Sequence, residues 1–283
     1  MKVTKRFPLS AATVLAVVFF CAVATPSIRA DPGTNPTSKF FVAEVDGTAT
    51  YNDGDKLDDL TNKTVHTAQG TTIETKAKSS NAMVMSNGVG VFLGPDTRAE
   101  YNKFTQEPFS ASRNDPEVEP SVSQTACSVP HGSVGLCTSK MVAGSNMVYN
   151  TPNASINIRG RKVAIQTSDN TTVVSAIEGE VTVRGDQLTG GENLKPGQQA
   201  IITRTSPTSP PQITIQPIPD NQKAAINDMV DSACAARKTV YFEEAKSKDN
   251  VFTKDPNPPE IVVKQVVQPT VNPVIVQSGG VIF

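Results

Sequence analysis

Apolar and polar positions alternate with a period of two through residues 151–204, the part of the chain with the densest structural signal. This period is typical of β-strands that bury one face, because successive side chains point to opposite sides of a sheet. Turns are predicted between these strands at Asp169-Asn170, Gly190-Gly191 and Pro196-Gly197. The apolar positions that define the strands are Ile156, Ile158, Val163, Ile165, Val173, Ile177, Val181, Val183 and Ile202.

The region before this stretch has the same character. Short apolar runs with turn residues between them recur at intervals of about ten residues, a spacing that argues for an all-β domain built as a sandwich or a solenoid. The strands expected there cover residues 41–45, 49–51, 72–76, 81–85, 89–93 and 99–104.

Two glycines interrupt the alternation. Gly160 separates two of the expected strands, and Gly179 lies between Glu178 and Glu180. A residue without a Cβ atom permits a bend or a bulge that bulkier side chains resist. We therefore expect a bend at Gly160, and near Gly179 either one long strand or two strands joined at a bulge.

The order and spacing of these motifs resemble the core signature of the FecR domain, an all-β periplasmic module of the FecR signalling proteins. The matching motifs are Thr151-Pro152, Arg159-Gly160, Glu178-Gly179 and Leu194 followed by Pro196-Gly197-Gln198. The chain departs from the family at Arg161, where Thr is more common. A run in residues 70–97 resembles the first half of the domain, so the resemblance covers residues 42–203. It implies a FecR-like solenoid or sandwich of short strands in residues 39–205.

Residues 1–30 have the layout of a secretory signal peptide. Three basic residues precede an apolar run from Ala11 to Ala24, and no acidic residue occurs before Asp31. The run is too short to favour a stable membrane span. Cleavage after Ala24 or after Ala30 fits the small residues there, and a polar linker, residues 31–38, follows. We expect an exported protein, periplasmic or extracellular. A retained leader and a lipid anchor on Cys21 are the disfavoured alternatives.

The charge of the mature chain excludes one class of partner. Loss of Lys2, Lys5, Arg6 and Arg29 with the leader leaves 22 basic against 27 acidic residues, a net charge of −5. Nucleic-acid binding requires a basic patch or stripe, and no such stripe is visible in this sequence. We expect no nucleic-acid partner.

Residues 107–125 are polar and proline-rich, and we expect an exposed loop there. Cys127 and Cys137 follow, on either side of a predicted turn at Pro130-His131-Gly132. In an exported protein, two cysteines that flank a turn most simply form a disulfide that clips a hairpin. We expect a Cys127–Cys137 disulfide, which would stabilise the fold by about 2–3 kcal/mol.

A metal site is the alternative for the same segment. Cys127, His131 and Cys137 supply three possible zinc ligands, but no fourth Cys or His lies nearby and the spacing matches no common zinc signature. His66 lies in a polar stretch and is expected to be solvated or simply hydrogen-bonded. We expect neither a metal nor another cofactor.

Arg159, Arg161 and Lys162 form the one basic cluster that invites an anion or partner contact, because arginine binds carboxylates and phosphates well. The favoured interpretation is plainer. Outward positions of alternating strands must be polar, so Arg159 faces solvent or pairs with an acid such as Glu178.

No residue pattern specifies a reaction. Glu178 and Glu180 share a face, but neither a histidine base nor a serine nucleophile elbow accompanies them. Cys234 lacks a histidine in a protease-like context. We expect no enzymatic activity.

The composition changes after Thr205. Residues 206–219 are a proline-rich connector able to lie extended along the β core. Apolar residues then recur at helical spacing, and we expect an amphipathic helix in residues 220–246 with Asp220 as N-cap. It is expected to pack on the β domain, with partner docking as the alternative. Cys234 on its apolar face is expected to be buried and inert, or else to form an intermolecular disulfide.

The tail, residues 247–283, is rich in Val, Ile and Pro. Pro269 and Pro273 prevent a regular helix or a central strand, so disorder is expected. The alternative is that Ile261 to Phe283 docks on a partner or adds a strand to a neighbouring sheet.

Three functions fit the sequence to different degrees. We expect a non-enzymatic binding or scaffold module of the cell envelope, whose partner is an envelope protein or a cell-wall polymer. Signal sensing is the alternative. FecR regulators carry a cytoplasmic segment before a membrane helix, whereas only ten residues precede Ala11, so a separate membrane partner would be needed. A cell-wall enzyme is disfavoured. The absence of Trp also weakens the expectation of an aromatic platform for sugars.

Overall fold

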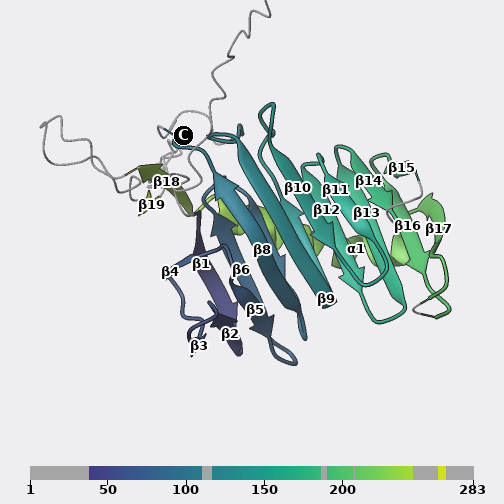
Figure 1. Cartoon of the computed structure of the whole chain (residues 1–283), viewed down its shortest axis with the longest axis horizontal. Coiled ribbons are helices and arrows are strands. Elements are labelled where there is room, and N and C mark those ends of the chain that lie inside the picture. Colours follow the sequence, from purple (N-terminus) through teal and green to yellow (C-terminus); the bar gives the residue numbers. More distant parts are fainter. Residues whose placement is uncertain (1–37, 110–116, 186–189, 207, 245–260, 266–283) are drawn as a thin grey trace, which may run out of the picture. The chain divides into compact units, whose positions relative to one another are not determined.

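The computed structural model describes residues 38–109, 117–185, 190–206, 208–244 and 261–265. The chain divides into two compact units, Met1–Gly33 and Thr34–Phe283, and all described residues belong to the second. Their regular structure is almost entirely β-strand, with a single helix (Figure 1). The expected all-β class with one C-terminal helix is therefore confirmed.

Two sheets share one long strand, β9 (Ser123–Cys137). Sheet A contains, in spatial order, β3 (Leu57–Asp59), β2 (Ala49–Asn52), β5 (Thr72–Thr75), β8 (Arg98–Gln106), the first half of β9, β10 (Asn146–Asn150), β11 (Ser155–Ile158), β14 (Val181–Arg184) and β15 (Glu192–Leu194). Sheet B contains β4 (Val65–Thr67), β1 (Lys39–Asp46), β6 (Ser80–Met85), β7 (Gly90–Leu93), the second half of β9, β12 (Lys162–Thr167), β13 (Thr171–Glu178), β16 (Gln198–Thr203) and β17 (Gln212–Pro217).

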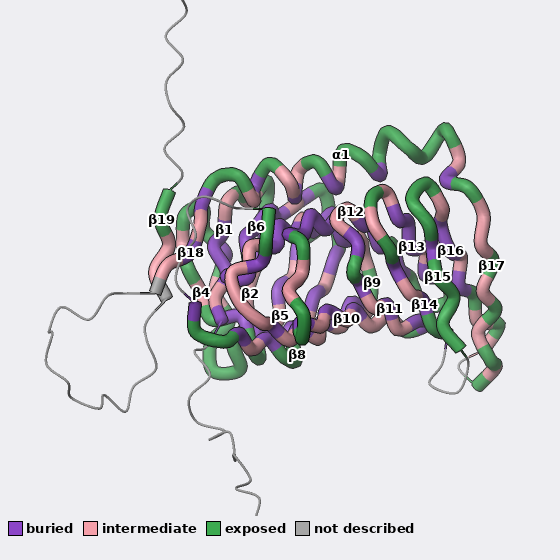
Figure 2. Tube along the Cα trace, turned by 90° about the horizontal axis from the view of Figure 1, so that it is seen from above, coloured by how far each residue is buried: buried purple, intermediate pink, exposed green. Residues whose placement is uncertain are grey.

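The core lies between the two sheets. Inward-facing side chains from both form one buried cluster, which includes Phe40 and Ile165 from sheet B and Ile73, Tyr101 and Tyr149 from sheet A. In sheet A the residues between them in sequence are mostly half-buried or exposed, as the alternation predicts, whereas central strands of sheet B such as β6 have consecutive buried residues. The fold is thus a sandwich, and its two layers are visible in Figure 2.

Strand β9 passes from sheet A to sheet B instead of forming a hairpin. Its first half pairs with β8 and, in parallel, with β10; its second half pairs with β7 and β12. The change of sheet occurs around Gly132, whose φ of +105° suits glycine. The turn predicted at Pro130-His131-Gly132 is therefore wrong, because the residues that favour a turn here bend a continuous strand.

The bend predicted at Gly160 is confirmed, whereas near Gly179 the expected single strand, or pair of strands joined at a bulge, is instead two strands in different sheets. At both points the chain crosses between sheets, from β11 to β12 and from β13 to β14. The two crossings lie against each other, since a Cβ atom on Gly179 would come within 2.5 Å of the Gly160 Cα. Backbone hydrogen bonds from Arg161 N to the Glu178 carbonyl (2.7 Å) and from Arg159 N to the Glu180 carbonyl (3.2 Å) hold them together.

Helix α1 (Asp220–Arg237) covers the outer face of sheet B (Figure 2). Ile226 and Val230 are buried against Ala164 of β12 and Ile218. The helix is shorter than the expected range 220–246, because Lys238 ends it and residues 240–244 are extended. The expectation that it packs on the β domain is correct.

A small second sheet lies beside the helix. It pairs β18 (Val240–Glu244) with β19 (Ile261–Gln265) in antiparallel fashion. Phe242 and Val240 pack with Phe41 and Val84 on the outer face of β1 and β6, and Val263 adds to this cluster. Residues 261–265 therefore contradict the expectation that residues 247–283 are disordered throughout; residues 245–260 and 266–283 lie outside the described residues.

The polar segment 107–125 is not simply an exposed loop. Phe109 is buried in the cluster below β18, and Glu119 is buried near the start of β9. The carboxylate of Glu119 accepts hydrogen bonds from the Ser123 hydroxyl and, at 3.1 Å, from the backbone N–H of Val142. A buried carboxylate with such donors fixes a chain reversal, which sequence polarity alone does not reveal. Residues 110–116 lie outside the described part.

Candidate functional site

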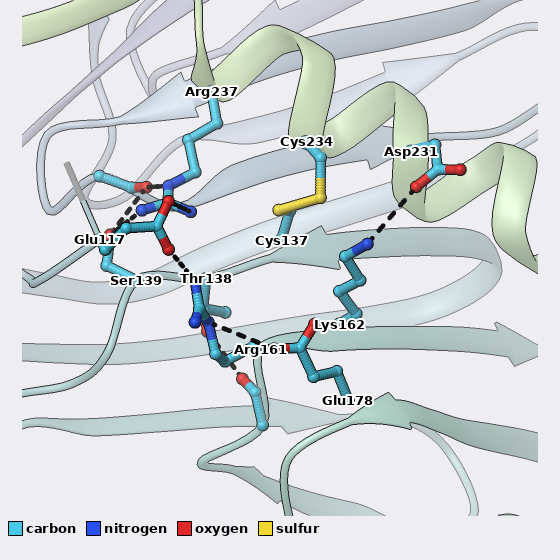
Figure 3. The surroundings of a disulfide bond; sticks show 12 residues. Glu117, Cys137, Thr138, Ser139, Arg161, Lys162, Glu178, Asp231, Cys234 and Arg237 are labelled. Atoms are coloured by element: carbon cyan, nitrogen blue, oxygen red, sulfur yellow. Dashed lines mark hydrogen bonds and ion pairs between the residues drawn. A yellow bond between two sulfur atoms is a disulfide. The ribbon is translucent and has the colours of Figure 1, made fainter. Parts of the chain in front are cut away.

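The disulfide of the structure joins Cys137 at the end of β9 to Cys234 in α1 (Figure 3). The predicted Cys127–Cys137 pair is therefore wrong, as is the expectation of an inert or intermolecular Cys234. Between Cys127 and Cys137 the chain is one extended strand, which separates them by roughly 30 Å at about 3.3 Å per residue. Disulfide formation requires Cα atoms within about 7 Å of each other.

The two cysteines of β9 also face different environments, Cys127 the core and Cys137 the outer side of sheet B. In the first half of the strand the odd-numbered positions, such as Cys127 and Val129, face the core, whereas in the second half Val134 and Leu136 do so. The change of sheet near Gly132 therefore reverses which positions face inward. Cys137 consequently faces outward, toward α1.

Cys127 has the surroundings of a structural cysteine. It is fully buried in the core near Tyr101 and Tyr149, and burial raises the pKa of its thiol far above the usual value. A nucleophilic or metal-binding cysteine needs the thiolate form. The thiol is thus poorly suited to either role.

A cluster of charged residues surrounds the disulfide (Figure 3). Arg237, at the end of α1, donates hydrogen bonds to the Gly88 carbonyl (2.9 Å) and to the Ser139 hydroxyl (2.8 Å). Its guanidinium also lies 4.0 Å from Glu117. Burial and the nearby Arg161 lower the pKa of Arg237. These contacts join the helix to the turn before β7 and to the segment after β9.

Two of the three basic residues singled out from the sequence belong to this cluster. Arg161 pairs with Glu117 and lies 3.7 Å from Glu178, and Lys162 lies 3.7 Å from Asp231 of α1. Arg161 and Lys162 already have carboxylate partners. The charged cluster around the disulfide therefore connects helix α1 to sheet B. Arg159 is exposed, and among the described residues its side chain has no ion pair. An anion contact at Arg159 stays a prediction.

His66 is more enclosed than its sequence context indicates. It lies in β4, with its ring centroid 5.2 Å from that of Phe40 and 4.2 Å from that of Tyr51. Its Nε2 is 2.7 Å from the Thr64 hydroxyl. Burial lowers the pKa of His66. No group of three or more His, Cys, Asp or Glu side chains within the described ranges is arranged to hold a metal ion.

The outer face of sheet A is the broad regular surface that neither α1 nor the β18–β19 pair covers. Asn, Ser and Thr are the most frequent residues at the half-buried or exposed positions of its central strands, β8 to β11, β14 and β15. We call this surface the amide–hydroxyl face. It comprises Asn102, Ser128, Asn146, Asn150, Ser155, Asn157, Thr182 and Asn193.

Hydrogen bonds between neighbouring strands order this face. The Asn102 amide donates to the Ser128 hydroxyl (2.7 Å), and the Thr182 hydroxyl donates to the Asn193 amide oxygen (2.7 Å). Asn157 and Asn146 are joined in the same way at 3.0 Å. Each amide and hydroxyl retains further donor or acceptor capacity toward solvent. The face is therefore a preformed array of both kinds of hydrogen-bonding group.

Charged side chains of sheet A lie beside the amide–hydroxyl face, and exposed Lys103 of β8 lies opposite Ala126. Arg98 of β8 pairs with Glu74 and, at 2.6 Å, with Glu100. Arg184 is exposed at the end of β14. The alternating sequence pattern predicts polar outward strand positions but does not single out this face. The available signal was the frequency of amides and hydroxyls at the outward positions of β9 to β11.

Comparisons with known proteins identify no family. No family model matches the chain, and no curated protein matches it. Two crystal structures of a protein described as a "putative anti-sigma factor" from Parabacteroides distasonis align with a TM-score of 0.39, at 17% and 18% identity. Each alignment covers 54% of this chain and 62% of the other, so that the match spans less than two thirds of those proteins. Similarity at this level supports no conclusion about function.

No helix in the described part of the chain is both long and apolar enough to cross a membrane.

Proposed function

We propose that this chain is a non-enzymatic, exported FecR-like module that binds a neutral, hydroxyl-rich polymer of the cell envelope. The observation that carries the proposal is the amide–hydroxyl face: a broad sheet surface, rich in amides and hydroxyls, that no described segment covers, while the opposite outer face is covered by α1 and the β18–β19 pair. The leader-like residues 1–30 and the Cys137–Cys234 disulfide support export, because disulfides persist in oxidising compartments.

The chemistry of the face favours a glycan over a protein partner. Protein interfaces are enriched in aromatic residues, Met and Arg and depleted in Ser at their centres. The centre of the amide–hydroxyl face consists of Asn, Ser and Thr, with Ala126 and Val148 as its small apolar members. Amides and hydroxyls donate and accept hydrogen bonds, as sugar hydroxyls do. Without an aromatic platform each contact is weak, so a polymer that spans several strands is the appropriate ligand.

Co-sedimentation with purified, insoluble cell-wall glycan tests the proposal. The oxidised mature chain is expected to pellet with the glycan, and the double variant Asn150→Ala/Asn157→Ala to bind roughly thirtyfold more weakly, at about 1 kcal/mol per lost hydrogen bond. Asn170→Ala, in an exposed turn away from the face, is the matched control and is expected to bind like the native chain.

Absence of binding, or equal binding by the double variant, would refute the glycan proposal. Crosslinking in native envelopes provides the second readout. Capture of an envelope protein through Asn150 or Asn157 would replace the polymer with a protein partner. Capture of a membrane signalling protein would favour the signal-sensing function that the FecR resemblance implies.

A further inference from the structure

Strand β17 forms one end of sheet B, and no described strand pairs with its outer edge. Among the described residues it pairs only with β16. None of its six residues is buried, and none is charged. Natural proteins commonly protect edge strands with charges, bulges or a covering segment, because unpaired backbone groups recruit other strands. Strand β17 has no charge and no described covering segment.

The sequence around this edge is a palindrome. Residues 211–217 read Pro-Gln-Ile-Thr-Ile-Gln-Pro, with Thr214 at the centre. Two copies of a strand that pair in antiparallel fashion about a two-fold axis place residue 214 − k opposite residue 214 + k. In this palindrome, each residue then faces its own kind: Ile213 faces Ile215, Gln212 faces Gln216 and Thr214 faces Thr214.

The hydrogen-bonding direction of β17 suits the same pairing. Ile218 N donates to the Gly197 carbonyl, toward β16. Because this direction alternates along a strand, the backbone groups of Ile213 and Ile215 point away from β16, toward the open edge. Pro217 and Pro211 fall on the same side and have no N–H to donate. Each copy therefore offers a short run of donors and acceptors that ends at a proline on both sides.

We propose that β17 is a homodimerisation edge, at which a second copy of this chain adds its own β17 about a two-fold axis through Thr214. The pairing joins sheet B of both copies into one continuous sheet. A two-fold axis perpendicular to the sheet keeps the core-facing side of both copies on the same side. Ile213 and Ile215, which pack only partly against the core, then meet the Ile215 and Ile213 of the partner copy. Isologous contacts of this kind are the commonest in homo-oligomers.

Contacts at both ends of β17 fix the position of this edge strand. Arg204 closes the turn before β17 by donating to the carbonyls of Ser209 and Gly185, both at 3.1 Å. At the other end Ile218 is buried and leads directly into α1. The prolines also define the register: a slip by two residues would place a proline opposite Ile213 or Ile215 and remove a backbone hydrogen bond.

The mature protein in solution tests the proposal through its mass. Light scattering coupled to gel filtration is expected to give twice the monomer mass, with dissociation on dilution. Thr214 is exposed, so that substitutions there leave the core intact. Thr214→Asp and Thr214→Lys each place like charges opposite each other and are expected to be monomers, whereas an equimolar mixture of the two is expected to form a heterodimer.

Oxidative crosslinking gives a second, independent readout. Thr214→Cys places two thiols at the non-hydrogen-bonded centre of the pair, where Cα atoms lie about 4.5 Å apart, and is expected to form a covalent dimer. Thr203→Cys, equally exposed but one strand back on β16, is the matched control and is expected to remain uncrosslinked. A native chain that is monomeric at all concentrations, a dimer that survives both charged variants, or equal crosslinking at both positions would overturn the proposal. Self-association lost only on deletion of residues 266–283 would assign the contact to the tail instead.

Discussion

At the scale of single residues, side chains with similar sequence contexts lie in different structural environments. Cys127 and Cys137 occupy positions of the same parity in one strand, yet one is sealed in the core and the other binds α1. Arg159 and Arg161 flank the same glycine, and of the two only Arg161 reaches an acidic partner within the described part of the chain. His66, in a polar stretch of sequence, stacks on an aromatic ring.

Because Cys127 is buried, we expect its thiol to be unreactive toward alkylating reagents until the protein unfolds. In the oxidised mature chain, an alkylating reagent at neutral pH is expected to leave the native protein unmodified, because burial excludes the reagent and keeps the thiol protonated. In denaturant without reductant, one label is expected, at Cys127. Intact-mass spectrometry reports both states. Labelling of the native protein, or a peptide in which Cys127 is linked to Cys137, would contradict the structure.

His66 predicts a component of the pH dependence of stability. Burial lowers its pKa below the usual 6.5, against the opposite effect of Asp53 and Asp58. As the pH falls through that value the unfolded chain binds the proton first, so the free energy of unfolding decreases. The stabilisation that comes from burying neutral His66 is therefore fully present above the pKa of His66 in the unfolded chain. It is lost as the pH falls toward the lower pKa of His66 in the folded protein. His66→Phe, which keeps a ring against Phe40, is expected to flatten this part of the profile in urea titrations. An unchanged slope would show that His66 is not its source.

At the scale of elements, covalent and close-packed contacts fix where segments distant in sequence meet. The disulfide ties α1 to β9 across a separation of 97 residues. The crossings at Gly160 and Gly179 join the β11–β12 connection to the β13–β14 connection by direct backbone contact. The disulfide and the glycine contact each join two segments that are distant in sequence. Each is tested below by a substitution at the contact and a matched control.

Removal of the disulfide is expected to destabilise the whole sandwich. A closed loop of this length restricts the unfolded chain by about 4.7 kcal/mol in the chain-entropy model. The double variant Cys137→Ala/Cys234→Ala is therefore expected to unfold at a clearly lower denaturant concentration than the oxidised native chain. Reductant should lower the midpoint of the native chain and leave that of the variant unchanged. Equal midpoints for the variant and the oxidised chain would contradict the prediction.

The glycine contact predicts an unusually costly Gly→Ala substitution. Gly179→Ala combines a φ of +85° with a Cβ atom 2.5 Å from the Gly160 Cα, and a loss of more than about 3 kcal/mol is expected. Gly197→Ala has a similar φ of +83° but open space around it, so only the conformational cost of about 1 kcal/mol remains. Urea unfolding of the two variants measures the difference. Equal losses would mean that the close approach contributes nothing.

At the scale of the whole molecule, local pattern predicted the sandwich but not its long-range contacts. Alternation located most strands, and Gly160 located a bend, because both signals reside in a few neighbouring residues. The disulfide partner, the buried Glu119 and the course of β9 depend on segments brought together by folding. The amide–hydroxyl face was visible only as polar outward positions, since its continuity requires the order of strands in sheet A.

The outer face of sheet B predicts how the molecule responds to loss of its C-terminal cover. Phe41 and Val84 are apolar outward residues that Phe242 and Val240 bury. A chain ending at Lys238 is expected to expose them, to bind a hydrophobic dye and to unfold more easily, because each buried large side chain contributes about 2 kcal/mol. A chain ending at Gln265 keeps β18 and β19 and is the matched control, expected to behave like the full-length protein. Dye fluorescence and urea midpoints are compared between the two truncated chains. Equal fluorescence and equal midpoints would mean that β18 and β19 do not cover this face.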